Sequence, residues 1–137
     1  MIAPLAFLLL LAIALGFGGR AGDPADRPAI LAIGTAAILT CAAQLFLHFY
    51  TAQLAVAGID VLLLGYIWWH AFRSHRYWPI WFAGCMITVV TFDICALVLP
   101  YGERSLFLVA SAFWALPALV VLVIGVSMDQ RITNKVR

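Results

Sequence analysis

The amino-acid sequence predicts an all-α protein, a polytopic integral membrane bundle of about five transmembrane helices in one domain over residues 1–137. Of the 137 residues, 66% are hydrophobic and 10% are charged, whereas a soluble domain usually carries about 25% charged residues. The mean hydropathy of the chain is +1.08. Because the apolar residues form long runs between short polar breaks, the chain cannot cover itself with polar surface and is expected to lie in a bilayer.

The first three helices follow from the positions at which the apolar runs stop. A helix is predicted at 2–17, because glycines, prolines and four charged residues interrupt the chain after it. The next apolar region, 29–72, has 44 residues and as one helix would be roughly 66 Å long, about twice the hydrocarbon thickness. The region must therefore fold back on itself. The turn is placed at residues 48–53, where polar and aromatic residues interrupt the aliphatic pattern. Helices are therefore predicted at 29–48 and 52–72.

The last two helices are bounded by a second set of breaks. A helix is predicted at 78–99, where Pro100 and the following glycine end it. Another is predicted at 105–126, with a kink at Pro117 that neighbouring helices can accommodate. The polar residues 127–137 are expected to form a frayed tail.

The distribution of the basic residues predicts the orientation of the bundle. It is an independent test of the topology, because these residues were not used to place the helices. Seven of the eight fall in the first loop, the third loop or the tail, which share one side of the membrane, and Arg104 falls on the other. The positive-inside rule places the richer side in the cytoplasm. We therefore expect an outer N-terminus and a cytoplasmic C-terminus in a bacterial inner membrane. No cleaved signal peptide is expected, because a basic n-region is missing.

Residues 65–82 contain eight aromatic residues, two arginines and two histidines, and form the predicted cytoplasmic turn between the third and fourth helices. Tryptophan and tyrosine rings are favoured at the headgroup level, where arginine meets anionic phosphates. The segment is first interpreted as an interfacial anchor. Contact with a lipid headgroup, a quinone or a partner protein is the alternative, because the same residue types make interaction hot spots. The residues concerned are Trp68, Trp69, His70, Arg73, Arg76, Tyr77, Trp78 and Trp81.

Two aspartates, Asp60 and Asp93, lie inside predicted helices, where insertion scales put the cost of a central aspartate at about 2.5–3.5 kcal/mol. They lie roughly 12 and 9 Å below the outer ends of consecutive antiparallel helices. Their carboxyl groups are therefore expected at nearly the same height. Other polar residues gather in the same outer half, and the inner half has no comparable set. The other members of this predicted polar cluster are Thr40, Gln44, His48, Gln53, Thr91, Arg104 and Ser111.

Three roles for the predicted polar cluster stay open. The aspartates can act as polar glue between helices, with Asp93 paired to Arg104 and Asp60 hydrogen-bonded to Gln44 or a threonine. They can also dock a basic residue on the helix of a partner protein. With His48 they can form a proton or cation site entered from the outer side, because two close carboxylates in a low dielectric do not both ionise cheaply.

Enzymatic and cofactor functions have little support in the sequence. We find no nucleophile elbow, phosphate loop or H-E-x-x-H motif, and no metal or cofactor is expected. His48 and His70 fall at opposite ends of their helices, so a haem could be held only between copies or between subunits. Nucleic acid is set aside, since the net charge is only +2. The unpaired cysteines Cys41, Cys85 and Cys95 are interpreted as packed hydrophobes.

The helix count, the outer N-terminus and the pair Trp78-Pro79 resemble the tryptophan-rich sensory proteins, which bind tetrapyrroles. The resemblance stops there and implies no site residue in this chain. We therefore expect a small non-enzymatic membrane protein, in contact with bilayer lipids, that is an accessory or structural subunit of an assembly or a homo-oligomer. The alternative is a small proton- or cation-coupled transporter or channel that uses the intramembrane acids, although 137 residues leave little room for an alternating-access carrier in one copy.

Overall fold

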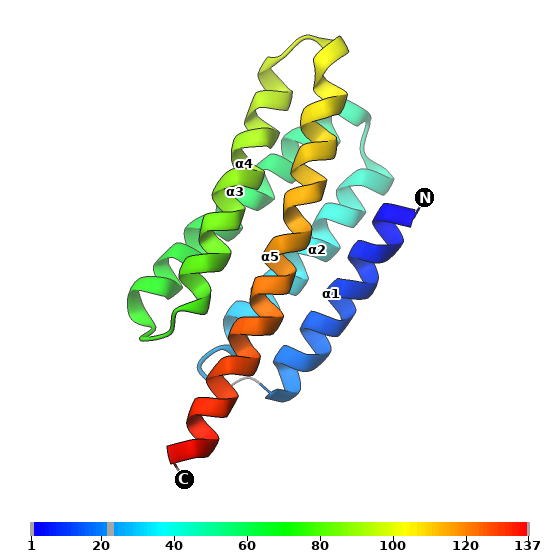
Figure 1. Ribbon diagram of the computed structural model, residues 1–137. Helices are drawn as coiled ribbons and strands as arrows, with labels where there is room; N and C mark the ends of the chain where they lie inside the picture. The colour runs from blue at the N-terminus through cyan, green and yellow to red at the C-terminus, as the bar shows by residue number, and fades with distance from the viewer. Residues whose placement is uncertain (1, 22–23, 137) are drawn as a thin grey trace.

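The computed structural model describes residues 2–21 and 24–136, and within these ranges every regular element is a helix. The helices run up and down in chain order (Figure 1). Four of them are long and apolar enough to cross a membrane, and the first helix contains a shorter apolar stretch at Leu11–Arg20. The chain is therefore a multi-pass helical membrane protein, as predicted. The helices are α1 (Ile2–Ala21), α2 (Arg27–Phe46), α3 (Phe49–Arg73), α4 (Trp78–Val98) and α5 (Tyr101–Val136).

The breaks between helices have local causes in the sequence. Leu99 ends α4 with extended backbone at ψ 152°, because the ring of Pro100 disfavours helical backbone in the residue before it. Leu47 and His48 are both extended and separate α2 from α3. Prolines stand at the start of α2 and α4, where the missing backbone N–H has no helical partner to lose. These short breaks fold consecutive helices back on one another.

Three helices are longer than the sequence predicted. α3 begins at Phe49 rather than at residue 52, because the extended break lies at Leu47 and His48. α1 continues past residue 17 to Ala21, because Gly18 does not end the helix but lies against α2. A Cβ on Gly18 would be 2.9 Å from Ile30 Cδ1, so the glycine permits close approach of the two helices. α5 begins at Tyr101, continues through Pro117 and includes the predicted tail, so the expectation of a frayed tail is wrong. Its 36 residues span roughly 54 Å, and its end projects beyond the other helices (Figure 1).

The helices form a closed ring. Each helix packs against its neighbours in the chain, and α5 also packs against α1 (Figure 1). α2 and α4 are not neighbours in this ring, and neither are α3 and α5. Large apolar side chains on every helix face outward, which fits contact with lipid.

The described apolar core fills one half of the bundle. Its largest members include Ile67, Phe82 and Leu122, each at most 2% exposed. This half leads to the end of the bundle where the α1–α2 connection, the α3–α4 turn and the C-terminal part of α5 lie together (Figure 1). We call this end of the bundle the basic end, because it carries Arg20, Arg27, Arg73, Arg76 and Arg131.

Candidate functional site

Two aspartates from neighbouring helices meet in the half of the bundle away from the basic end. Asp60 of α3 and Asp93 of α4 bring their carboxyl groups within hydrogen-bonding reach of each other, and the hydroxyl of Ser111 on α5 lies at Asp93. Asp93 is 7% exposed, and its Oδ2 has no hydrogen-bond partner among the described residues. The structure thus brings together three members of the predicted polar cluster. We call Asp60 and Asp93 the acid pair.

The acid pair has two chemical capacities. Two carboxyl groups can hydrogen-bond to each other only when one of them carries a proton, so the pair can hold a proton between α3 and α4. Two ionised carboxylates side by side would instead attract a small cation, for which carboxylate and hydroxyl oxygens are suitable ligands. Both capacities depend on the relative positions of three helices.

The other members of the predicted polar cluster lie elsewhere. Thr91 is exposed, and its Oγ1 donates to the carbonyl four residues earlier in α4 at 2.7 Å. His48 is exposed in the break between α2 and α3, and Gln44 is exposed on the last turns of α2, so the prediction that these three line the cluster is wrong. Thr40 is half-buried on α2. Gln53 is half-buried two turns before Asp60, and its Oε1 has no hydrogen-bond partner within the described part of the chain.

Arg104 caps a helix, and the ion pair with Asp93 that the sequence suggested is not formed. The guanidinium is buried, with the residue 6% exposed. Its Nε donates to the carbonyl of Ala96 at 2.7 Å and its Nη2 to the carbonyl of Leu97 at 3.3 Å. These carbonyls belong to the last turn of α4, where a helix provides no partner of its own. Arg104 therefore joins the start of α5 to the end of α4.

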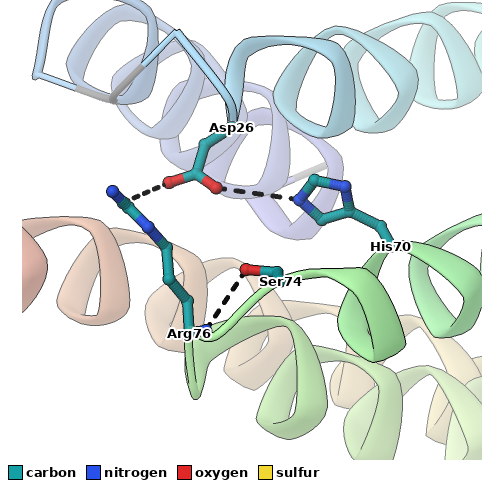
Figure 2. Close-up of polar contacts among 4 residues, drawn as sticks. All are labelled: Asp26, His70, Ser74 and Arg76. Carbon is teal, nitrogen blue, oxygen red and sulfur yellow. Dashed lines mark hydrogen bonds and ion pairs between the residues drawn. The ribbon is translucent and has the colours of Figure 1, made fainter.

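A second buried polar cluster lies at the basic end and centres on Asp26 (Figure 2). Asp26 precedes the first turn of α2 and is 1% exposed. Its Oδ2 accepts a hydrogen bond from Nη1 of Arg76 at 2.5 Å, and its Oδ1 lies 3.7 Å from Nε2 of His70. Ser74 Oγ accepts from the backbone N–H of Arg76 at 3.2 Å. We call these four residues the Asp26 clasp, because they join the start of α2 to the end of α3 and the following turn.

Trp78 lies beside the clasp inside the bundle. It is 3% exposed, its ring is 6.4 Å from that of His70, and its edge contacts Phe82. A Cβ on Gly125 of α5 would overlap the Cβ of Trp78, so this glycine makes room for the tryptophan. The ring of Tyr66 stacks on that of His70 with centroids 6.4 Å apart. Two aromatic rings therefore contact the imidazole and restrict its movement next to Asp26.

The Asp26 clasp corrects the sequence-based view of the basic half, which was expected to lack a polar set. Arg76, His70 and Trp78 were interpreted as residues of the membrane interface, but they face the bundle interior. Asp26 was treated as an ordinary loop charge. The available signal was its place directly before a Pro-containing helix start, where an acidic residue interacts favourably with the helix N-terminus.

Like Trp78, Phe82 of this segment lies in the core, and Tyr66 is half-buried, but the other aromatic residues of the segment lie on the surface, as an interfacial anchor requires. Arg73 places its guanidinium carbon 4.3 Å from the ring centre of Trp69, which is 51% exposed. Such stacking of arginine on tryptophan leaves the guanidinium edge available for phosphate. The other exposed aromatic members of the segment are Trp68, Phe72, Tyr77 and Trp81.

No group of three or more His, Cys, Asp or Glu side chains among the described residues could hold a metal ion, and the three cysteines are free and half-buried. No family model matches the chain, and neither a curated protein nor a solved structure is similar to it. The class that the fold defines is a multi-pass helical membrane protein with an acid pair in one half and an ion-pair clasp in the other.

Proposed function

We propose that the protein is a small non-enzymatic protein of the bacterial inner membrane that works with other transmembrane chains, as a homo-oligomer or as an accessory or structural subunit. The observation that carries this proposal is the exposed face of α3. Gly58 and Gly65 lie two turns apart on that face, and a Cβ on either would meet no heavy atom within 4 Å. The fold of one copy therefore does not require glycine at these positions.

Exposed glycines favour association in a membrane. Glycine in a helix interior costs about 1 kcal/mol relative to alanine, so a packing reason is expected where it persists. Small residues let the backbones of two transmembrane helices approach closely, which increases their van der Waals contact. Leu62, 75% exposed, and Trp69 flank the glycines and would pack around such a contact. A second copy is the simplest partner, because a twofold interface needs only one self-complementary face.

The orientation proposed for this association follows from charge. The basic end would face the cytoplasm by the positive-inside rule, with the acid pair in the outer half of the membrane. The exposed aromatic residues and Arg73 would then contact lipid headgroups at the cytoplasmic surface.

The test is the size and composition of the particle extracted from native membranes. A tagged chain would be purified in a mild detergent or a polymer disc and analysed by mass spectrometry and sizing. We expect a dimer that Gly58→Leu and Gly65→Leu convert to monomer, while the control Gly16→Leu, at an equally open position of α1, leaves it intact. A stoichiometric different protein would make the chain an accessory subunit. A wild-type monomer without a partner would overturn the proposal.

A second candidate function, a small proton- or cation-coupled transporter or channel, is favoured by the acid pair. Asp93 and Trp78 lie toward opposite ends of the interior face of α4, and the apolar side chains of Phe82, Met86 and Val89 fill the length between them. Such a layer would separate a polar site open to one side from a closed end on the other.

Flux measurements distinguish this candidate from the first. Purified protein in liposomes would be tested for proton or sodium flux driven by a pH or sodium gradient. Asp60→Asn and Asp93→Asn should abolish flux without changing particle size, and Thr91→Val, on the exposed face of α4, should leave it unchanged. Absence of flux in the wild-type protein would refute the transport function.

A further inference from the structure

We propose that the Asp26 clasp keeps the basic end of the bundle closed, so that breaking it admits water to the bundle interior from that side. The proposal is independent of the functions discussed above. It rests on where the clasp lies in the ring, on which of its members are buried, and on what it covers.

The clasp joins the start of α2 to the end of α3 and to the turn after it. Asp26 stands at the start of α2, His70 lies on the last turn of α3, and Arg76 belongs to the turn that leads into α4. Because α2 packs against α3 but not against α4, the ion pair between Asp26 and Arg76 links the start of α2 to the segment that positions the start of α4. The residues are 50 positions apart in the chain, so the contact restrains tertiary structure rather than one local turn.

The two charged side chains of the clasp differ in how far they are buried. The side chain of Asp26 is 1% exposed, whereas that of Arg76 is 22% exposed. The long arginine side chain reaches from the surface onto the buried carboxylate, and Ser74 holds the backbone of its turn. His70 faces the second carboxylate oxygen from α3. A guanidinium and an imidazole from different positions therefore converge on one buried carboxyl group (Figure 2).

The clasp covers the end of a continuous interior face. Next to it is Trp78, and Phe82 follows one turn further along α4. Cys85, two turns from Trp78, is half-buried and packs against the apolar core. If the start of α2 separates from the α3–α4 turn, water entering past Trp78 reaches Cys85 before it reaches the acid pair.

The native cysteines provide the test. Cys85 lies in the basic half of α4, whereas Cys41 and Cys95 lie toward the other ends of α2 and α4. The protein would be reconstituted in nanodiscs and treated with a membrane-impermeant maleimide, and labelling at each cysteine would be followed by peptide mass spectrometry. We expect Asp26→Asn to raise the rate at Cys85 about tenfold, since loss of one hydrogen bond to a charged group shifts a local opening equilibrium by that order.

Two controls make the result specific. Arg27→Gln removes a charge next to Asp26 from an exposed side chain and should leave the labelling rate of Cys85 unchanged. If Asp26→Asn does not fold, the double variant Asp26→Asn, Arg76→Gln takes its place, because it removes both charges together. Its labelling rate at Cys85 should rise in the same way. An unchanged rate at Cys85 would overturn the proposal. An equal rise at all three cysteines would also overturn it, because it would indicate general unfolding.

Discussion

Neutral substitutions of Asp26 and Arg76 should affect stability unequally, because the two side chains are buried to different extents. Arg76→Gln leaves the carboxyl group of Asp26 in place at 1% exposure, with Nε2 of the His70 imidazole 3.7 Å away, beyond hydrogen-bond distance. Asp26→Asn leaves the guanidinium of Arg76, which is 22% exposed and can turn toward water or lipid phosphate.

The magnitudes follow from that difference. Removing one partner of a buried ion pair typically costs about 3–5 kcal/mol, because the other charge stays buried without compensation. For Arg76→Gln we expect about 3 kcal/mol, the lower end of that range, because the guanidinium is itself partly exposed. For Asp26→Asn we expect about 1.5 kcal/mol, the lower end for a hydrogen bond to a charged group. The double variant leaves no buried charge and should therefore lose less stability than Arg76→Gln alone.

The assay is unfolding of the purified protein in mixed micelles of increasing dodecyl sulfate content, followed by tryptophan fluorescence and circular dichroism. Arg73→Gln is the matched control, because it removes the same charge near the same turn from a guanidinium that stacks on Trp69. It should cost no more than about 1 kcal/mol. The reasoning would be refuted if Asp26→Asn destabilised the protein as much as Arg76→Gln, or if the double variant lost the sum of the two single losses.

Further expected outcomes concern packing and topology. Gly125→Ala should destabilise the bundle by about 1–3 kcal/mol in the same assay, because the added methyl group overlaps Trp78; Gly84→Ala, at an open position, should cause no loss, and equal effects would contradict the packing described. Trp78→Ala should cost about 3–5 kcal/mol, whereas Trp81→Ala, at a side chain 69% exposed, should change stability by less than about 1 kcal/mol. A periplasm-active reporter joined to the C-terminus should be inactive in cells, and activity there would reverse the proposed orientation.

The fold could be predicted because the bilayer restricts the choices of an apolar chain. A long apolar segment in lipid must satisfy its backbone hydrogen bonds internally, which makes it a helix. The boundaries were less predictable where packing overrides local signals. Gly18 would end many helices, yet its contact with Ile30 extends α1. The polar residues after residue 126 gave no apolar pattern, yet α5 continues through them.

The two polar clusters differ in how far the sequence could reveal them. Asp60 and Asp93 lie on consecutive helices, so their depths alone indicate that they can meet. Asp26 and Arg76 are 50 residues apart, and their contact depends on the arrangement of the whole ring. Trp78 and Trp81 look alike in the sequence, but Trp78 shares the buried face of α4 with Phe82, and Gly125 on α5 makes room for it.

The closed ring also has a consequence for how the chain is made. α1 leaves the ribosome well before α5, although α5 is one of its two neighbours. Until α5 is inserted, α1 to α4 can form only an open row, in which the flank of α1 and the flank of α4 both lack their final partner. The part of the core that α5 supplies, including Leu119 and Leu122, arrives last. A nascent chain that stops before α5 is therefore an unfinished row rather than a smaller bundle, and its two flanks are where lipids or insertion factors must substitute for protein.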